Sequence, residues 1–561
     1  FTFFLALVLF SLSKMLVFGV ALTVLCQLVA AEKKVVTFYG NRHSPRLVEG
    51  AASSTTTSDW TAQATYTPSS DHISNFAQLN VESNKERDDD EQMFAAGYLE
   101  ASLSAESIFN HYNNMLCQVD CSGYVPPELS AFFDAQDAWM REQIADNKEC
   151  PYWTYMGSLL AQKEGLMAGY NASTFGSMEG HSLSPWAFTF LNSLGDLLDI
   201  LPALSNEGSF RRPNFDKMTY HEAHVYLRSN GRCSALLKMT DDMSDVFFGH
   251  STWFMYSSMV RIYKTYTLPL SNPASVMTTM SFSSYPATLS SSDDFYLMKE
   301  TQLSMLQTTN NIFNATLWDL VKPQSLLAWQ RVRAANQMAN DGPAWHKIVA
   351  AHNSGTYNNQ YMIFDGKKFT PGNALQDNAL YIVEQIPGYV AGGDATDVLE
   401  KGYWSSYNVP YHQDIYVKSG YGSVDAKADH ALFTEYQMAD RAQLFRRDVG
   451  KVSSMDEMEY IMRQNDFQTD PIAAGDPWGA ICARGDLEPS SPSGSGGTDS
   501  KISSWSALKK GTLEAYIVNG PTSQGQKPFA WSTSGLSESY SHMGQPDLFD
   551  FEFETVFAFE Q

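Results

Sequence analysis

The sequence predicts a mixed α+β fold built from packed layers. Strand-like runs with Ser/Thr-rich connections occupy residues 35–82, helical spacing dominates residues 95–170, and strand-like runs return from residue 276. This separation of strands and helices along the chain is typical of α+β proteins. The 561 residues are 43% hydrophobic and 18% charged, which describes a globular chain long enough for two ordinary domains or one large one.

Periodicity and turn chemistry predict the individual elements in order. A period near 3.6 residues predicts helices over residues 95–114, 128–144, 152–170, 254–266, 317–340 and 344–352, with a helix end in 191–199. Strands are predicted over 35–82, 276–309 and 360–390, with a turn at Asp365-Gly366. Residues 205–216 and the Ser/Gly-rich stretch from Ser490 to Ser500 are predicted loops.

One short segment combines a turn, a cysteine and an apolar run. Asn230 and Gly231 form the turn, Cys233 follows, and a second apolar run ends at His250 after the polar cluster 241–244. Two short apolar runs joined by polar turn residues predict a β-hairpin. Cys233 then begins the first strand, and His250 lies near the end of the second strand on the same side of the hairpin.

A cysteine in this place could serve as a nucleophile. A thiol reacts as the thiolate and therefore needs a base nearby. Cleavage of the chain just before Cys233 would supply that base, because the freed α-amino group has a reference pKa near ~7.7. A lone cysteine is also commonly a buried structural thiol, so the spacing alone leaves both interpretations open.

The beginning of the chain predicts entry into the secretory pathway. Residues 1–31 are strongly apolar and end in small residues, with Met15 a candidate start, which is typical of a signal peptide. No later run reaches ~18 unbroken apolar residues, so no transmembrane span is expected in the mature protein. A formal net charge of −24 argues against nucleic acid and anionic membrane surfaces as partners.

Other residues fit a lumenal protein. Asn171 and Asn314 each begin an N-glycosylation triplet. One disulfide is expected among Cys117, Cys121 and Cys150, whereas Cys482 has no evident partner. The stretch 221–224 (HEAH) is one residue short of the zinc-protease spacing, so neither a metal nor another cofactor is expected.

A series of short sequence blocks runs in order over nearly the whole chain. They are CSALLK at 233–238, Ser244-Asp245, His250, Thr252-Trp253, SMVR at 258–261, SSYP at 283–286, SDDFY at 292–296, NSGTYNNQ at 353–360, EQIPG at 384–388, YWSSYNVP at 403–410, RAQLFRR at 441–447, NGPT at 519–522 and GQPD at 544–547. Together these blocks resemble the phospholipase B-like family of lysosomal proteins, which includes the laminin-ancestor proteins.

The resemblance implies a specific fold and a maturation step. The fold would be the four-layer αββα sandwich of N-terminal nucleophile hydrolases. Self-cleavage of the Arg232–Cys233 bond would follow removal of the signal peptide 1–31. It would leave an N-terminal fragment 32–232, which stays associated with the C-terminal fragment 233–561.

The resemblance also assigns roles to residues that packing or a surface pair would explain equally well if each were taken alone. Cys233 is the nucleophile. His250 is a second proton carrier or an orienting group, and Asn408 is a candidate donor to the substrate oxyanion. The remaining matches are the pocket residues Trp253 and Thr309, together with Arg441, which would bind a carboxylate or phosphate or support the site.

We therefore expect a lumenal acyl hydrolase that releases acyl chains from phospholipids through a cysteine thiolate and an acyl-enzyme. A small-amide hydrolase of the same mechanism is an alternative. A non-catalytic lumenal protein that binds a lipid or another ligand is a second alternative. The expected partners are a phospholipid or another acylated small molecule and the chain's own N-terminal fragment. A homodimer, and delivery to lysosomes as against secretion, stay open.

Overall fold

The computed structural model describes residues 33–52, 59–69, 75–119, 124–205, 218–229, 231–425 and 434–558. Several sequence predictions fall on residues outside these ranges. They are the signal peptide, most of the predicted loop 205–216, Asn230 in the turn, and Cys121.

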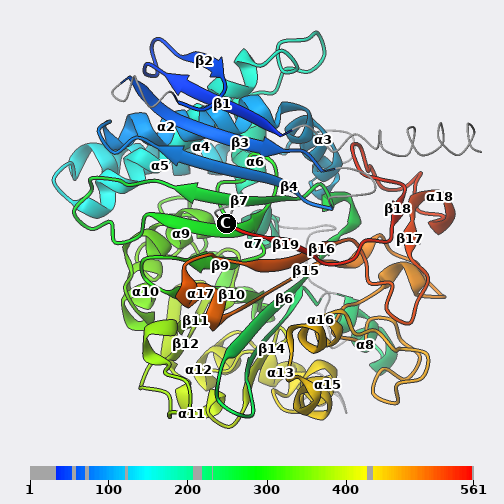
Figure 1. Cartoon of the computed structure of the whole chain (residues 1–561). Helices are drawn as coiled ribbons and strands as arrows, with labels where there is room; N and C mark the ends of the chain where they lie inside the picture. Colours follow the sequence, from blue (N-terminus) through cyan, green and yellow to red (C-terminus); the bar gives the residue numbers. More distant parts are fainter. Residues whose placement is uncertain are drawn as a thin grey trace, which may run out of the picture.

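The described strands form two large sheets and a two-stranded ribbon (Figure 1). The larger sheet has the order β13-β12-β11-β10-β9-β8-β7-β4-β3-β1-β2, in which β4 and β7 are parallel neighbours and the other pairs are antiparallel. Its strands are β1 Lys34–Tyr39, β2 Arg46–Glu49, β3 Trp60–Thr67, β4 Ala77–Ser83, β7 Ile262–Thr267, β8 Thr279–Ser284, β9 Phe295–Met298, β10 Leu303–Thr309, β11 Asn359–Asp365, β12 Leu380–Ile386 and β13 Tyr389–Asp394.

The smaller sheet is antiparallel and contains the predicted hairpin. Its order is β14-β5-β6-β15-β16-β19. The strands are β14 Tyr403–Ser406, β5 Cys233–Met239, β6 Val246–Met255, β15 Ser495–Ser504, β16 Ala515–Asn519 and β19 Glu554–Val556, and the ribbon pairs β17 Phe529–Ala530 with β18 Leu548–Phe549. The β5–β6 hairpin closes with Met239 opposite Val246, and the Thr240 amide donates to the Asp245 carbonyl over 3.0 Å. The hairpin prediction is confirmed.

The helices flank the sheets on both sides. They are α2 Asp89–Leu103, α3 Ala105–Met115, α4 Pro127–Asp146, α5 Pro151–Ala172, α6 Pro185–Asn192, α7 Leu194–Leu204, α8 Tyr220–Ser229, α9 Ala328–Met338, α10 Gly342–Val349, α11 Thr396–Leu399, α12 Gln413–Lys418, α13 Tyr421–Asp425, α15 Asp440–Asp448, α16 Met455–Arg463, α17 Trp505–Lys510 and α18 Trp531–Ser534. Short 3₁₀ turns are η1 Leu116–Gln118, η3 Tyr256–Ser258, η4 Ala315–Leu320, η5 Gly366–Lys368, η6 Val449–Lys451 and η7 Gly485–Leu487.

Three apolar clusters define how these elements are stacked. Leu237 and Phe248 of the smaller sheet share one cluster with Leu306 and Phe364 of the larger sheet, so two sheet faces meet. The other face of the larger sheet packs against α2, α4, α5 and α9. The other face of the smaller sheet packs against α15 and α16. The structure therefore confirms the predicted α+β class.

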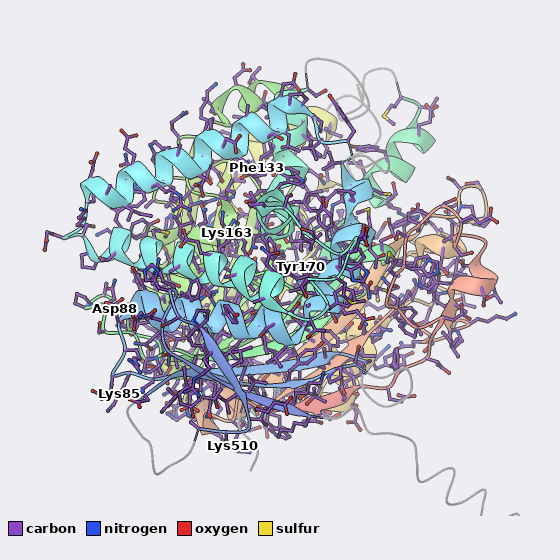
Figure 2. All side chains as sticks on the ribbon, turned by 90° about the horizontal axis from the view of Figure 1, so that it is seen from above. Lys85, Asp88, Phe133, Lys163, Tyr170 and Lys510 are labelled. Atoms are coloured by element: carbon purple, nitrogen blue, oxygen red, sulfur yellow. The ribbon has the colours of Figure 1, made fainter. Side chains whose placement is uncertain are left out.

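The helical layer on the larger sheet is tightly packed. Figure 2 shows Phe133 of α4 and Tyr170 of α5 in this layer, with Lys510 at the end of α17 on the opposite side of the view. The backbones of helices α2 and α5 are in close contact at Gly97, where there is no room for a side chain. A Cβ at this position would lie 2.0 Å from the Gln162 carbonyl oxygen. A larger side chain at this crossing would push the two helices apart.

Three predicted elements were wrong. The amphipathic helix over 254–266 is instead the end of β6, the turn η3 and strand β7. Because β7 is buried on both faces, its apolar residues do not alternate, and periodicity misreads it. The helix over 317–340 is helical only in α9 and in the 3₁₀ turn η4, since Pro323 interrupts the pattern.

The third wrong element is the Ser/Gly-rich loop 490–500. Half of this stretch is β15, a central and almost fully buried strand. Its small residues reflect close neighbours, because a Cβ at Gly497 would lie 2.2 Å from the Cys482 sulfur.

Within the described residues, no single helix is long and apolar enough to cross a membrane. The pair α6 and Leu197–Leu204 meets the length and composition only when its two members, bent by 106°, are taken together.

Candidate active site

Cys233 is the first residue of β5, where the hairpin places it beside the other predicted site residues. Thr252 of β6 lies opposite Cys233, and His250 lies opposite Ala235. Residues two apart in a strand point to the same face, so Cys233, His250 and Thr252 share one face of the smaller sheet. The Cys233 side chain is buried, with 2% of its surface exposed.

The peptide bond before Cys233 is held by a main-chain donor. The amide of Trp253 donates a hydrogen bond to the Arg232 carbonyl oxygen. The same amide acts to lower the pKa of the neighbouring Cys233 thiol, against the larger opposing effects. Burial, followed by the nearby Asp293 carboxylate, raises the pKa of the Cys233 thiol to about 12. The thiol of the uncut chain is therefore protonated at physiological pH.

Asn408 and Arg441 fix the backbone on either side of this bond. Asn408 Oδ1 accepts from the Arg232 amide over 3.0 Å, and its Nδ2 donates to the Thr309 carbonyl over 2.7 Å. Arg441 donates to the Cys233 carbonyl and to Asn408 Oδ1. In the uncut chain, the Asn408 side chain thus positions the Arg232 amide. The donor at the carbonyl oxygen of the Arg232–Cys233 peptide bond is the Trp253 amide, which sequence reasoning missed.

The Trp253 ring packs against the Arg441 guanidinium. The Arg441 guanidinium lies over the Trp253 ring, 4.3 Å from its centre. The indole Nε1 donates to the Ile481 carbonyl over 3.0 Å, which fixes the ring. Burial lowers the pKa of Arg441 to about 10. Because the Arg441 guanidinium is already bound to protein oxygens and stacked on Trp253, it supports the site in this structure.

His250 is a neutral, fully bonded side chain. Its Nε2 lies 2.7 Å from the Gln307 carbonyl oxygen, and its Nδ1 lies 3.0 Å from the Lys501 ammonium. A carbonyl can only accept and an ammonium can only donate, so Nε2 carries the proton and Nδ1 accepts. Burial, reinforced by Lys501, holds the pKa of His250 well below its usual range. These contacts favour the orienting role over that of a second proton carrier.

A buried group of charges surrounds His250 and was not found from the sequence. Lys501 pairs with Asp499 over 2.6 Å, Asp499 with Arg261 over 2.7 Å, and Arg261 with Asp293 over 2.8 Å. Two cations and two anions balance, so the group carries no net charge when all four are ionised. Despite burial, Arg261 and Lys501 lower the pKa of Asp499 to about 2. Asp499 and Lys501 lie two residues apart in β15, so both side chains point to the same face of the sheet. This spacing was a local signal in the sequence of a charged pair that faces the core.

Three cavities surround the segment that ends at Cys233. The Cys233 cavity, of about 20 Å³, is lined by Cys233, Asp293 and Thr309 among others. The Met255 cavity, of about 260 Å³, lies along Met255 and Trp478. The Arg441 cavity, of about 60 Å³, is lined by Arg441 and Asn408 among others. Trp253 lines all three, and Thr309 lines the Cys233 cavity.

The predicted glycosylation and disulfide residues lie away from Cys233 in sequence. Asn171 is exposed at the end of α5. Asn314 caps η4, and its Nδ2 also donates to the Lys418 carbonyl over 3.1 Å. Cys117 is disulfide-bonded, which fits the predicted pairing in part, whereas Cys150 and Cys482 are free thiols.

Comparison with known proteins identifies the family. The family model described as Phospholipase B matches residues 62–556. The chain belongs to the phospholipase B family. It is 40% identical over 465 residues to Phospholipase B-like 1 of Rattus norvegicus, covering 83% of this chain and 81% of the relative. It is 41% identical over 465 residues to Phospholipase B of Crotalus adamanteus, covering 83% and 82%.

A relative from another organism gives a similar match. Phospholipase B-like protein B of Dictyostelium discoideum is 38% identical over 483 residues, which covers 85% of this chain and 82% of that protein. The resemblance inferred from the motifs around Cys233 is therefore confirmed.

Proposed function

We propose that this chain is a lumenal acyl hydrolase that matures by cutting itself before Cys233 and then acts on ester bonds of phospholipids. Membership of the phospholipase B family makes the chain an ester-bond hydrolase. The observation that carries the cysteine mechanism is the Trp253 amide, which donates to the carbonyl of Arg232, the residue directly before the buried Cys233 thiol.

The self-cleavage step uses the contacts around this bond. The Cys233 sulfur attacks the Arg232 carbonyl carbon, and the Trp253 amide stabilises the negative charge that develops on the oxygen. The thiol proton passes to the departing Cys233 nitrogen as the peptide bond breaks, which leaves a thioester. Water then hydrolyses the thioester and releases an Arg232 carboxylate and a free α-amino group.

Substrate turnover would repeat this chemistry with the new amino group as base. Its ordinary pKa near ~7.7 is close to neutral, and burial lowers the pKa of an amine further, which suits a base in an acidic lumen. The amine takes the thiol proton, the thiolate attacks the ester carbonyl, and an acyl-enzyme forms. His250 and Lys501 hold the neighbouring strand in place but exchange no proton in this scheme.

The two fragments would remain together after the cut. Strand β4, before the cut, pairs with β7, after it, in the middle of the larger sheet. Lys264 of β7 also forms a fully buried ion pair of 2.7 Å with Glu100 of α2. Separation would expose a sheet edge, an apolar helical layer and two unpaired charges at once.

The layers of the fold support this class of enzyme. Helices on the two outer sides and two facing sheets agree with the αββα sandwich of N-terminal nucleophile hydrolases. The Cys117 disulfide and the exposed Asn171 support a lumenal protein, lysosomal or secreted, since disulfides and N-glycans are acquired in the secretory pathway.

The decisive experiment compares purified wild-type protein with Cys233→Ala and Cys233→Ser at acidic pH. Intact mass under reducing conditions should reveal a wild-type chain that begins at Cys233, and Cys233→Ala should stay uncut. Cut wild-type protein should release fatty acid from phosphatidylcholine, and Cys233→Ala should not. A wild-type chain that stays whole, or equal turnover by Cys233→Ala, would refute the proposal.

The same samples separate the two alternatives. Turnover of N-acyl amides in preference to phospholipids would indicate the small-amide hydrolase. A cut protein that binds lipid but turns over neither class would indicate a binding protein whose cleavage is only maturation.

A further inference from the structure

The cut itself marks where a substrate acyl group must lie. During self-cleavage, Arg232 is the acyl group attached to the Cys233 sulfur, with its oxygen at the Trp253 amide. A substrate acyl group attached to the same sulfur, with its oxygen at the same donor, begins where the Arg232 backbone now lies. The space next to Arg232 is therefore the space that an acyl chain enters.

Arg232 lies between two of the three cavities. The Cys233 cavity and the Met255 cavity share four lining residues, namely Leu198, Arg232, Trp253 and Phe254. Three of the four are apolar, and the fourth is the residue that the cut separates from Cys233. Departure of Arg232 would leave an apolar passage between the two cavities. The Met255 cavity, of about 260 Å³, is near the lower end of small-molecule sites, whereas the Cys233 cavity has only about 20 Å³ while Arg232 is in place.

Leu198 is the residue of α7 that lines both the Cys233 cavity and the Met255 cavity. Its neighbours Leu197 and Leu201 belong to the main apolar core, whereas the half-buried Leu198 is in none of the described core clusters and faces the two cavities. Across from it, Phe254 comes from β6, after the cut. The passage is thus built from both fragments.

The Arg441 cavity is a poor place for an acyl chain. Arg228 pairs there with Asp440 over 2.6 Å, and Arg441 adds a third charged side chain to the lining. An alkyl chain would have to displace water from these groups without returning hydrogen bonds, which is costly.

On this basis we propose that, in the cut protein, the Cys233 and Met255 cavities join into one apolar cleft that binds the acyl chain of the substrate, with Leu198 setting its width. This inference rests on the proposed function and adds the location of the chain. It predicts that Leu198 governs which acyl groups are accepted, while the thiol chemistry itself is unchanged.

The test uses the full-length, self-cut protein in four forms: wild type, Leu198→Trp, Leu198→Ala and Leu204→Trp. Leu204 ends the same helix but packs on the core away from these cavities, so it is the matched control. Cleavage is first measured by intact mass. The probes are p-nitrophenyl butyrate, octanoate, palmitate and naphthoate, and the lysophosphatidylcholines with the same straight chains.

In Leu198→Trp, we expect kcat/KM for palmitoyl relative to butyryl substrates to fall roughly tenfold or more, as is typical when a hydrophobic pocket is altered by a few carbon atoms. Leu198→Ala should raise the naphthoyl rate relative to octanoyl, and Leu204→Trp should keep the wild-type ratios. If Leu198→Trp stays uncut, the naphthoyl-to-octanoyl rate ratio of Leu198→Ala serves as the test. Unchanged ratios in cut Leu198 variants would overturn the inference while leaving the proposed function intact.

If the cut wild-type protein hydrolyses none of the probes, the proposed function fails. A measurement of fatty-acid binding then tests whether the two cavities form the proposed cleft. Parinaric acid, a fluorescent fatty acid, should be excited by energy transfer from Trp253 and Trp478, which line the Met255 cavity. Loss of that signal in Leu198→Trp, but not in Leu204→Trp, would support the cleft. Equal signals in both variants would overturn it.

Discussion

Asp196 links the stability of this protein to pH. It lies in the first turn of α7 with 1% of its surface exposed. Its Oδ1 accepts hydrogen bonds from the Ala328 amide, over 3.0 Å, and from the Thr356 hydroxyl. Burial raises the pKa of Asp196 to about 6 from its ordinary 3.8, because these two hydrogen bonds and the nearby Arg331 offset the lost hydration only in part.

The sign of the effect follows from the direction of this shift. Between about pH 4 and pH 6, the folded protein holds a proton on Asp196 that the unfolded chain has released. The stabilisation is complete below about pH 4 and is lost as the pH rises through about 6. A difference of about two pKa units corresponds to about 3 kcal/mol of unfolding free energy.

Asp196→Asn isolates this contribution. The amide keeps Oδ1 for both hydrogen bonds and carries no charge, so it resembles the protonated acid. At about pH 7, we expect the variant to be more stable than the parent by about 3 kcal/mol, and at about pH 4 the two should be nearly equal.

The assay is urea unfolding followed by tryptophan fluorescence at several pH values, with both proteins in a Cys233→Ala background. That background keeps the chain in one piece under the proposed maturation. Titrating groups that do not interact with Asp196 are common to both proteins and cancel in the difference. Asp294 does not cancel fully, because the Asp196 charge contributes to raising the pKa of Asp294. Destabilisation of Asp196→Asn at neutral pH, or a difference that does not vary with pH, would refute the reasoning.

Three further substitutions test the packing of the fragments and the site. Glu100→Gln should lower the unfolding free energy by about 3–5 kcal/mol in urea titrations, because it leaves the Lys264 charge buried and unpaired; a loss below about 1 kcal/mol would contradict this. Arg441→Lys keeps the charge but loses the forked guanidinium that binds the Cys233 carbonyl and Asn408. Self-cleavage, timed on gels, should therefore slow on the order of a hundredfold. Cleavage at the wild-type rate would contradict a positioning role for Arg441. Asn408 has a φ of 69°, so Asn408→Gly should be more stable to heat than Asn408→Ala by about 1 kcal/mol, while both cut slowly; rapid cutting by the glycine variant would show that only the backbone shape matters.

The fold class and the hairpin could be predicted because their signals are local. Two apolar runs around a polar turn at 240–245 were enough to place Cys233 at the start of a strand. The strands β7 and β15 were misread for different reasons. Strand β7 is buried on two faces, so its apolar residues follow no strand period. Strand β15 was misread from its Ser and Gly content, which reflects close neighbours in a buried strand.

The site was predicted only as far as the family motifs reach. The side chains named from the motifs do gather around Cys233, but the Trp253 donor is a main-chain group that leaves no trace in residue type. The charges around His250 come from strands and loops far apart in sequence, such as Arg261 and Lys501. Their pairing depends on which sheets meet, and only the three-dimensional structure supplies that.

The parallel pairing of β4 with β7 has a consequence for the life of the protein if it matures by the proposed cut. In the uncut chain this pairing forms within one molecule, so the two partners meet at high effective concentration. Once the link at Arg232–Cys233 is broken, regaining the same sheet requires two separate chains to find each other. The mature protein would then be a one-way product whose persistence depends on how slowly it opens, not on its capacity to refold. Each molecule would have one opportunity to fold, and it would come before the cut.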